Sequence, residues 1–359
     1  MGARHTVGRD LLRHAGGRAV AGRSELTVDL GALRRNVRTI LRALDGAELW
    51  AVVKAEAYGH GALDAARAAL DEGAAALCVA TVGEAIPLRA ELPAVRILVM
   101  GQAHQLKEAR EAKLEVTVGA GPVPEGLPVH LKLDSGMGRW GYSELPAPGR
   151  DVVGLMTHLA SADCDPAFTR QQIERFRAAT QAFGSFTRHA ANSAAALRCP
   201  EARFDAARCG VALYGLSPFG SDPADDGLEP VLAWRSSLAQ VKRLAAGEST
   251  GYGRRFVATA ETWIGLVPVG YADGFRRDLT GTEVLVDGER RPVVGAVSMD
   301  TIAIDLGGER TVGTPVTLVG DGLLLEEHAR VAGTINYELA CGIGNASRPA
   351  RADRRALDA

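Results

Sequence analysis

Residues 76–100 read ALCVATVGEAIPLRAELPAVRILVM, and this stretch decides the fold because it contains one complete repeat of the chain's pattern. An apolar run, ALCVAT (76–81), is followed by the helix-like stretch EAIPLRAEL (84–92) and then by a second apolar run, VRILVM (95–100). Short apolar runs that alternate with helix-like stretches are typical of parallel strands joined by crossover helices. The sequence therefore predicts a strand–helix–strand unit here.

The same alternation extends through much of the chain. Eight apolar runs are present, namely LWAVVKA (49–55), ALCVAT (76–81), VRILVM (95–100), LEVTV (114–118), VHLKLD (129–134), VVGLMTH (152–158), FTRHAAN (186–192) and AARCGVAL (206–213). Helix-like stretches such as ALDAARAALDEG (62–73) separate most of them. The segment GAGPVPEGLP (119–128) is too rich in Pro and Gly for a full helix and predicts a shortened crossover. Eight such repeats predict an α/β fold with a (β/α)8 TIM-type barrel.

The sequence pattern differs on both sides of the region that contains the eight runs. Residues 217–230 (SPFGSDPADDGLEP) form a turn-rich linker, and 231–320 carry β-type runs separated by short turns. We therefore expect a barrel domain over 24–230 and a smaller, mainly antiparallel β domain over 231–359. As an alternative, the predicted strand over 24–30 could pack with the second domain. Residues 1–23, rich in Arg and Gly, are expected to form a disordered extension, with an organellar targeting segment as the alternative.

Composition excludes several classes of function. Among 359 residues, 41 Lys and Arg face 43 Asp and Glu, so the net charge of −2 offers no basic surface for nucleic acid. No window approaches the 18 consecutive apolar residues of a membrane span. Five scattered cysteines, an odd number without a CxxC pair, argue against a disulfide framework and a zinc site. We expect a cytoplasmic protein that binds a small molecule, no metal, no nucleic acid and no membrane.

Reactive side chains follow several of the predicted barrel strands. Lys54 ends the first run, Arg139 follows the fifth, His158 ends the sixth, Ser193 follows the seventh and Arg208 lies in the eighth. Barrel enzymes build their active sites at the C-terminal ends of the strands. The sequence therefore predicts that these five side chains converge.

The last two of these strand ends have the features of a phosphate site. The tripeptide 192–194 (NSA) and the tetrapeptide 208–211 (RCGV) follow the strands whose loops commonly hold phosphate in barrels, and Gly210 would let the backbone approach an anion closely. A lysine opposite a phosphate cradle is the layout for pyridoxal phosphate, in which the amine forms a Schiff base. We therefore predict this cofactor.

Each candidate also has a structural interpretation when it is considered alone. Lys54 could extend its amine to water, and Arg139 could be a solvated charge at the rim. His158 could be a hydrogen-bonded core histidine, and Ser193 could be a helix N-cap. In the second domain, Tyr252 could pack in a turn and Met299 could belong to the core. These structural interpretations are independent of one another, so each applies to one residue and none explains the whole set.

Taken together, nine motifs in order resemble the alanine racemase family from about residue 25 to 355. They are AVVKAEAYGHG (51–61), VHLKLDSGMGRWG (129–141), MTHLASAD (156–163), ANSA (191–194), RCGVALYGLSP (208–218), GYGRRF (251–256), PVGYADGF (268–275), VSMD (297–300) and INYE (335–338). The resemblance implies a pyridoxal-phosphate barrel followed by a β domain, in a head-to-tail homodimer that shares its active sites. It also implies racemisation of L-alanine and D-alanine, with D-alanine supplied to peptidoglycan.

The resemblance also implies roles for individual residues. Lys54 would hold the cofactor and act as the base on one face of the substrate α-carbon, and Tyr252 of the partner subunit would be the base on the other face. His158, linked to Arg208, would assist Tyr252, and Arg208 would face the pyridine nitrogen. The remaining implied positions are Tyr58, Ser193, Gly210, Val211 and Tyr337 for the phosphate, Arg139, Met299 and Tyr271 for the substrate, and Lys132 as a carbamylated lysine.

Two departures from the family pattern leave alternatives open. Glu56 stands where the family usually has Asn, and Cys209 replaces a frequent Pro. A racemase of another or broader amino-acid range, an amino-acid decarboxylase, and a catalytically silent protein that binds pyridoxal phosphate are the rival hypotheses. Decarboxylation would not need Tyr252 or Arg139. A dinucleotide site is not expected, because 251–253 and 342–347 lack the full glycine fingerprint.

Overall fold

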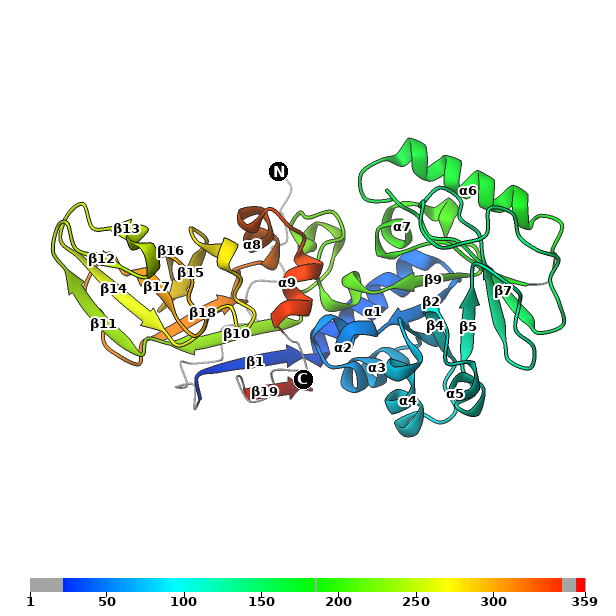
Figure 1. Ribbon diagram of the computed structural model, residues 1–359, viewed down its shortest axis with the longest axis horizontal. Coiled ribbons are helices and arrows are strands. Elements are labelled where there is room, and N and C mark those ends of the chain that lie inside the picture. Colours follow the sequence, from blue (N-terminus) through cyan, green and yellow to red (C-terminus); the bar gives the residue numbers. More distant parts are fainter. Residues whose placement is uncertain (1–21, 185, 344–352, 359) are drawn as a thin grey trace, which may run out of the picture. The chain divides into compact units, whose positions relative to one another are not determined.

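The computed structural model describes residues 22–184, 186–343 and 353–358 (Figure 1). The described chain divides into two compact units. The barrel unit comprises Val28–Val231 with 335–343 and 356–358, and the β unit comprises 22–27, Leu232–Thr334 and 353–355. Each unit has its own core.

Eight parallel strands close the barrel in sequence order. They are β2 (Glu48–Val52), β3 (Ala76–Val79), β4 (Ile97–Gln102), β5 (Glu115–Val118), β6 (Val129–Lys132), β7 (Val152–Met156), β8 (Thr187–His189) and β9 (Ala206–Cys209). Each of the eight apolar runs overlaps one strand, so the predicted barrel is confirmed. The strands can be recognised in the sequence because strands that are buried on both faces are continuously apolar.

Helices connect most of these strands. The helices of the barrel unit are α1 (Leu30–Leu44), α2 (Lys54–Tyr58), α3 (Ala62–Asp71), α4 (Val82–Glu91), α5 (Leu106–Glu111), α6 (Pro166–Thr180), α7 (Ser193–Arg198) and α9 (Asn336–Ile343), with 3-10 turns η1 (Pro200–Ala202), η2 (Val211–Tyr214) and η3 (Pro223–Asp226). Residues 119–128, all of which are described, form no helix, as their Pro and Gly content predicts.

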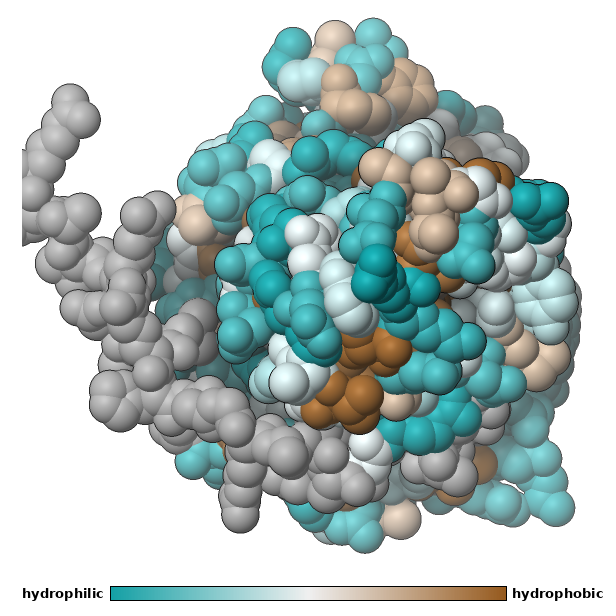
Figure 2. All heavy atoms as spheres, turned by 90° about the vertical axis from the view of Figure 1, so that its left-hand side faces the viewer, coloured by the Kyte–Doolittle hydropathy of each residue, from teal (hydrophilic) through white to brown (hydrophobic). Residues whose placement is uncertain are grey.

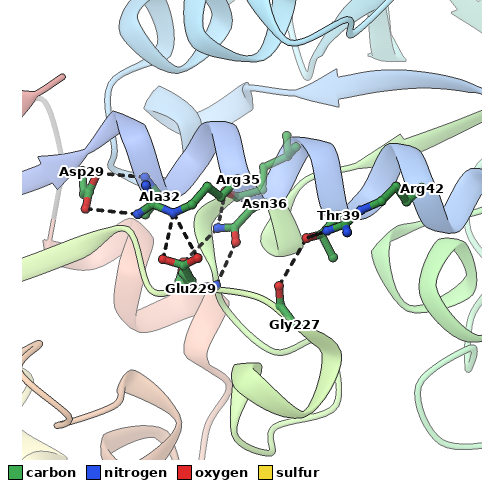
Figure 3. Close-up of polar contacts among 9 residues, drawn as sticks. Asp29, Ala32, Arg35, Asn36, Thr39, Arg42, Gly227 and Glu229 are labelled. Carbon is green, nitrogen blue, oxygen red and sulfur yellow. Dashed lines mark hydrogen bonds and ion pairs between the residues drawn. The ribbon is translucent and has the colours of Figure 1, made fainter. Parts of the chain in front are cut away.

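Helix α1 is fixed to the end of the linker by a buried asparagine (Figure 3). The Asn36 amide donates to the carbonyl oxygens of Leu213 (3.1 Å) and Glu229 (2.8 Å), and its side-chain oxygen accepts from the Glu229 N–H (2.8 Å). Asp29 caps the helix by accepting from the Ala32 N–H at 2.8 Å. The linker therefore packs on the barrel as an ordered segment.

The β unit is built on a mainly antiparallel sheet with strand order β11-β14-β17-β16-β15-β18-β10-β1-β19. The strands are β1 (Ser24–Asp29), β10 (Leu232–Ser237), β11 (Gln240–Leu244), β14 (Thr262–Val267), β15 (Glu283–Val286), β16 (Glu289–Val294), β17 (Ile302–Asp305), β18 (Pro315–Val319) and β19 (Asp353–Leu357). A small pair, β12 (Ser249–Thr250) with β13 (Phe256–Val257), the 3-10 turn η5 (Arg277–Leu279) and helix α8 (Leu325–Ala332) complete the unit. The predicted fold class, a barrel with an antiparallel β domain, is confirmed. The face shown in Figure 2 is mainly hydrophilic, with small hydrophobic patches.

Most of the expected N-terminal extension, residues 1–21, lies outside the described residues. Arg23 at its end is described, and its guanidinium donates to the carbonyl oxygens of Pro268 and Asp300, each at 3.1 Å. Within the described ranges, every helix is too short or too polar to cross a bilayer. All five cysteines are described, and each is a free thiol.

Candidate active site

Lys54 begins a left-handed turn just beyond the end of β2. The four residues from Ala55 to Tyr58 have φ angles of 51°, 53°, 54° and 54°, and none of them is glycine. Hydrogen bonds from the Ala57 N–H to the Val53 carbonyl (2.9 Å) and from the Gly59 N–H to the Ala55 carbonyl (3.1 Å) close the turn. A left-handed helical residue costs about 1–2 kcal/mol. Neighbouring groups must therefore hold this turn in place.

Glu84 on α4 supplies part of that support. Its carboxylate accepts from the backbone N–H groups of Ala55 (2.9 Å), Ala80 (2.7 Å) and Thr81 (3.3 Å). The Thr81 hydroxyl in turn accepts from the Glu84 N–H at 3.2 Å, which completes a capping box. One carboxylate therefore links the turn after Lys54 to the end of β3 and the start of α4.

The environment of Lys54 shifts its protonation equilibrium toward the neutral amine. Burial lowers the pKa of Lys54, and the nearby positive charge of Arg139 lowers it further, whereas the Glu84 carboxylate acts in the opposite direction. A neutral amine is the nucleophilic and basic form of lysine. The geometry of β2 and its turn thus places an amine with a lowered pKa at the C-terminal end of the barrel.

Arg208 and His158 lie together beside this lysine. One Arg208 nitrogen, Nη2, donates to the Thr157 carbonyl at 2.8 Å and lies 3.3 Å from His158 Nδ1. Burial lowers the pKa of His158 well below its usual value, and the charges of Arg208, Lys132, Arg139 and Lys54 add to this effect. His158 is therefore a neutral imidazole that accepts from Arg208 at Nδ1 and keeps Nε2–H as a donor.

Lys132 and Arg139 both lie over the ring of one tryptophan. The Lys132 ammonium lies 5.3 Å from the Trp140 ring centroid, and the Arg139 guanidinium lies 5.2 Å from it. Burial lowers the pKa of Lys132 to about 8, helped by the charges of Arg139 and Arg208 and opposed by Asp134. Lys132 is 3% exposed, whereas Arg139 is exposed and free to meet a ligand. Two cations in such proximity favour an anion between them.

The predicted phosphate residues surround Gly210. The Ser193 hydroxyl accepts from the backbone N–H groups of Gly210 (3.1 Å) and Ala212 (3.4 Å). The interpretation of Ser193 as a helix N-cap is wrong, because Asn192 caps α7 by accepting from the Ala195 N–H at 3.0 Å. Ser193 instead ties the ends of β8 and β9 together.

Tyr58 explains why position 210 is glycine. A Cβ atom at Gly210 would lie 2.6 Å from the Tyr58 hydroxyl oxygen, so only glycine lets this phenol reach the backbone. The Tyr58 ring lies 6.1 Å from that of Tyr337, and burial raises the pKa of both phenols. Both hydroxyls are therefore held as neutral hydrogen-bonding groups. Val211 begins η2 directly after Gly210 and is buried.

The other three predicted residues belong to the β unit and are exposed. Tyr252 in η4 (Tyr252–Arg254) is 75% exposed, Met299 is 52% exposed and Tyr271 is 38% exposed. The interpretations of Tyr252 as a packed turn residue and Met299 as a core residue are therefore wrong. Tyr271 and Met299 lie on two loops joined by backbone hydrogen bonds, one of which runs from the Ala272 N–H to the Met299 carbonyl at 3.0 Å. These side chains are available to a molecule outside their own core.

The two departures from the family pattern have structural accounts. The Glu56 carboxylate accepts from the Ala62 N–H at 3.3 Å, which satisfies a donor at the start of α3. Cys209 is fully buried, and burial raises the pKa of its thiol to about 12, so it is a small uncharged side chain. Cys209 therefore contributes neither a charge nor a nucleophile to the predicted phosphate site.

The sequence did not predict several residues that support the site. Glu84, Trp140 and His189 support Lys54, Arg139 and Arg208, respectively, but each occupies a position that an ordinary helix cap, loop or strand end would explain. For His189 a signal exists, because it is a polar residue within a predicted core strand. Among the described residues, no group of three or more His, Cys, Asp or Glu is placed to hold a metal ion.

Comparisons with known proteins cover both units. Residues 28–218 match the family described as "Alanine racemase, N-terminal domain", and residues 231–351 match "Alanine racemase, C-terminal domain". The alanine racemase of Lactiplantibacillus plantarum is 40% identical over 89% of this chain and 95% of its own length, and that of Streptomyces coelicolor is 40% identical over 90% and 94%. The solved alanine racemase from Streptomyces coelicolor A3(2) has a TM-score of 0.85 at 39% identity, covering 94% of this chain and 98% of its own. The biosynthetic alanine racemase from Pseudomonas aeruginosa has a TM-score of 0.85 at 36% identity, covering 93% and 99%.

Proposed function

The chain belongs to the alanine racemase family and is an amino-acid racemase, and on this premise we propose that it interconverts L-alanine and D-alanine with pyridoxal 5'-phosphate. The observation that carries the proposal is the pairing of Lys54, whose pKa is lowered, with the Ser193–Gly210 cradle at the same end of the barrel. The same constellation would serve a racemase of broader amino-acid range or a silent binder, which the experiment below distinguishes.

The residues present fit this cofactor. Its aldehyde requires a neutral amine, and the lowered pKa of Lys54 increases the neutral fraction. Its phosphate requires a narrow site lined with hydrogen-bond donors. The backbone of Gly210 and the hydroxyl of Tyr58 form part of such a site, because they lie so close together that a Cβ at residue 210 would meet Tyr58. Its pyridine nitrogen accepts a hydrogen bond, and Arg208 is a donor that does not release its proton. Tyr58, Ser193, Gly210, Val211 and Tyr337 would hold the phosphate.

When bound, pyridoxal phosphate supplies an aldehyde for the amino group of the substrate and a ring that withdraws electrons from the α-carbon. Racemisation then requires a proton to leave one face of that carbon and another to arrive at the opposite face. Lys54 would exchange the proton on one face. The Tyr252 phenol would exchange it on the other, with His158 and Arg208 as the hydrogen-bonded groups that assist it.

Tyr252 would come from the partner subunit of a homodimer. Its 75% exposure supports this role, because a largely exposed phenol is available to another chain. The proposal therefore assigns the cofactor to the barrel domain (24–230) and the second base to the β domain (231–359). The exposure of Tyr271 and Met299 on two hydrogen-bonded loops supports a substrate-facing role for the same domain.

The substrate carboxylate would bind Arg139 together with Met299 and Tyr271. Lys132 would become a carbamate by reaction of its neutral amine with carbon dioxide and loss of a proton. The pKa of about 8 at Lys132 supports this step, since an appreciable fraction of the amine is neutral near physiological pH. The resulting negative charge would lie beside Arg139 and orient it. D-alanine made in the cytoplasm would supply peptidoglycan, and five free thiols suit that compartment.

Turnover with stereochemical analysis tests the proposal. The purified full-length protein, loaded with pyridoxal phosphate, is given L-alanine, and D-alanine is measured by chiral chromatography beside a Lys54→Ala control. D-alanine formation that is absent from the control is expected. A protein that binds the cofactor but racemises serine or a basic amino acid, and not alanine, would contradict the assignment of alanine. One that binds the cofactor and racemises none of these would be a silent binder.

A further inference from the structure

A chain of buried hydrogen bonds crosses the barrel core from Arg208 to Glu115. Arg208 Nη1 lies 2.7 Å from His189 Nδ1, His189 Nε2 lies 2.9 Å from His130 Nδ1, and His130 Nε2 lies 2.8 Å from Glu115 Oε2. Both histidines are 0% exposed and Arg208 is 3% exposed. We call these four side chains the Arg208–Glu115 relay.

The relay connects opposite ends of the barrel. Glu115 is the first residue of β5, and His130 is the second residue of β6. His189 is the last residue of β8, and Arg208 is the third of the four residues of β9. Because the eight strands are parallel, the relay runs from the N-terminal edge of the barrel to the end that carries Lys54.

Only one arrangement of protons satisfies every link. A guanidinium can only donate, so His189 Nδ1 must accept from Arg208 and His189 must carry its proton on Nε2. That N–H donates to His130 Nδ1, so His130 also carries its proton on Nε2. The second N–H donates to the Glu115 carboxylate. The two rings are therefore neutral and point the same way.

The relay provides the buried guanidinium with a distant negative charge. Arg208 contacts two neutral imidazoles and the carbonyl oxygens of Thr157, His189 and Ala190, and in the described chain its direct partners include no carboxylate. An uncompensated buried charge is costly. Two aligned imidazole dipoles between a cation and an anion polarise one another and lower that cost.

Glu115 is held as an anion at the far end. Burial alone would raise its pKa, but hydrogen bonds from His130 and Arg96 lower it to about 2. Arg96 Nε donates to Glu115 Oε1 at 3.0 Å. The Trp50 ring packs against both histidines, with centroid distances of 5.6 Å to His130 and 4.4 Å to His189, and helps to keep water away.

We propose that Glu115, His130 and His189 are positioning residues that fix the charge and the aim of Arg208. The hydrogen bonds above occupy both Nη atoms of Arg208, and in the described part of the chain none involves Nε. The relay therefore leaves Nε–H as the remaining donor of Arg208, and we assign this donor to the site. That this donor meets the pyridine nitrogen rests on the proposed function, whereas the relay itself does not.

The tautomers of the two histidines provide the first test. The full-length protein, loaded with pyridoxal phosphate and labelled with ¹⁵N-histidine, is examined by NMR, with His130→Gln and His189→Gln used for assignment among the eight histidines. Both rings should be neutral with Nε2–H, and neither should titrate between about pH 5 and 8. The charged groups around the rings are Glu115, Arg96 and Arg208, and two of the three disfavour an imidazolium. An Nδ1–H tautomer or a titrating ring at either position would overturn the proposal.

A matched pair of variants provides the second test. Glu115→Gln keeps an acceptor oxygen but removes the charge. Glu48→Gln removes the charge of a carboxylate that also faces Arg96, at 3.6 Å, keeps an acceptor oxygen for the Trp50 indole N–H (2.7 Å) and lies outside the relay. For Glu115→Gln we expect kcat to fall about tenfold, KM for alanine to change less than about twofold, and the affinity for pyridoxal phosphate to fall about tenfold, because the lost interaction involves a charged group. Glu48→Gln should change none of these.

Equal effects of the two variants, or no effect of Glu115→Gln, would contradict the relay. If Glu115→Gln does not fold, the histidine tautomers of the unaltered protein still test the relay. Tautomers and cofactor affinity are measured without turnover. A protein that lacks racemase activity would therefore contradict the proposed function without affecting the outcome of the relay test.

Discussion

The Glu84 carboxylate accepts a hydrogen bond from the Ala55 N–H at 2.9 Å, one residue after Lys54. This contact links α4 to a turn that four non-glycine residues hold in left-handed geometry. Because such geometry is unfavourable by itself, the position of the Lys54 amine depends on a residue that has no direct role in proton transfer.

Replacement of Glu84 with alanine should loosen this turn. The change removes the acceptor of three backbone N–H groups, and we expect the free energy of unfolding to fall by about 1–3 kcal/mol. Affinity for pyridoxal phosphate should fall as well. Urea unfolding and a spectroscopic titration with the cofactor measure the two effects. The control is Glu91→Ala on the same helix, which removes only an exposed ion pair with Arg67 and should change stability by less than about 0.5 kcal/mol. Similar losses in both variants would contradict the role of Glu84 in holding the turn after Lys54.

Replacement of Gly210 with alanine should place a methyl group 2.6 Å from the Tyr58 hydroxyl oxygen. We expect lower thermal stability and weaker binding of pyridoxal phosphate, because backbone and phenol cannot both keep their places. Gly149→Ala is the control, since its Cβ would meet no atom within 4 Å. Adding Tyr58→Phe should recover part of the lost stability, although not the lost affinity. If the double variant is no more stable than Gly210→Ala, the clash is not the cause.

Lys132 should make part of the activity depend on pH and carbon dioxide. Its pKa of about 8 is lowered from 10.5, so the neutral amine that forms a carbamate increases as pH rises through about 8. A ¹³C-bicarbonate NMR experiment should detect a carbamate carbon in the parent protein and none in Lys132→Arg, and the variant should have a raised KM for alanine. Absence of the signal from the parent protein would contradict carbamylation.

The same shift has a consequence for the stability of protein with an unmodified Lys132. Because the folded-state pKa is depressed, the unfolded chain binds more protons between about pH 8 and 10.5. Lys132 therefore destabilises the fold fully below about pH 8, and this penalty is relieved as pH rises toward 10.5. Lys132→Met should remove this rise in stability, which unfolding curves across the range would measure.

Much of the fold could be predicted because its pattern is periodic. The eight barrel strands are apolar on both faces, so they stand out as runs such as 95–100, and the Pro-rich crossover at 119–128 lacks a helix as its composition requires. The left-handed turn after Lys54 could not be predicted, since Ala-Glu-Ala-Tyr contains no glycine and local propensity opposes this conformation. Tertiary contacts such as that of Glu84 override propensity here.

The candidate site was predictable where chemistry coincides with strand ends. Lys54, His158 and Arg208 follow this rule, and the structure brings them together. Ser193 and Asn192 show the limit of the rule, because either could cap α7 and only tertiary structure shows which does. The relay histidines lie within strands, where one polar side chain reveals neither its partner nor its tautomer.

The most direct test of the account follows α-hydrogen exchange in deuterated water, for L-alanine and D-alanine separately, in the parent protein and in Tyr252→Phe. With two bases on opposite faces, the parent protein should exchange and invert both enantiomers. Tyr252→Phe should still exchange the α-hydrogen of one enantiomer through Lys54, yet form almost none of the opposite enantiomer. Inversion of both enantiomers by Tyr252→Phe at the parent rate would contradict the two-base account.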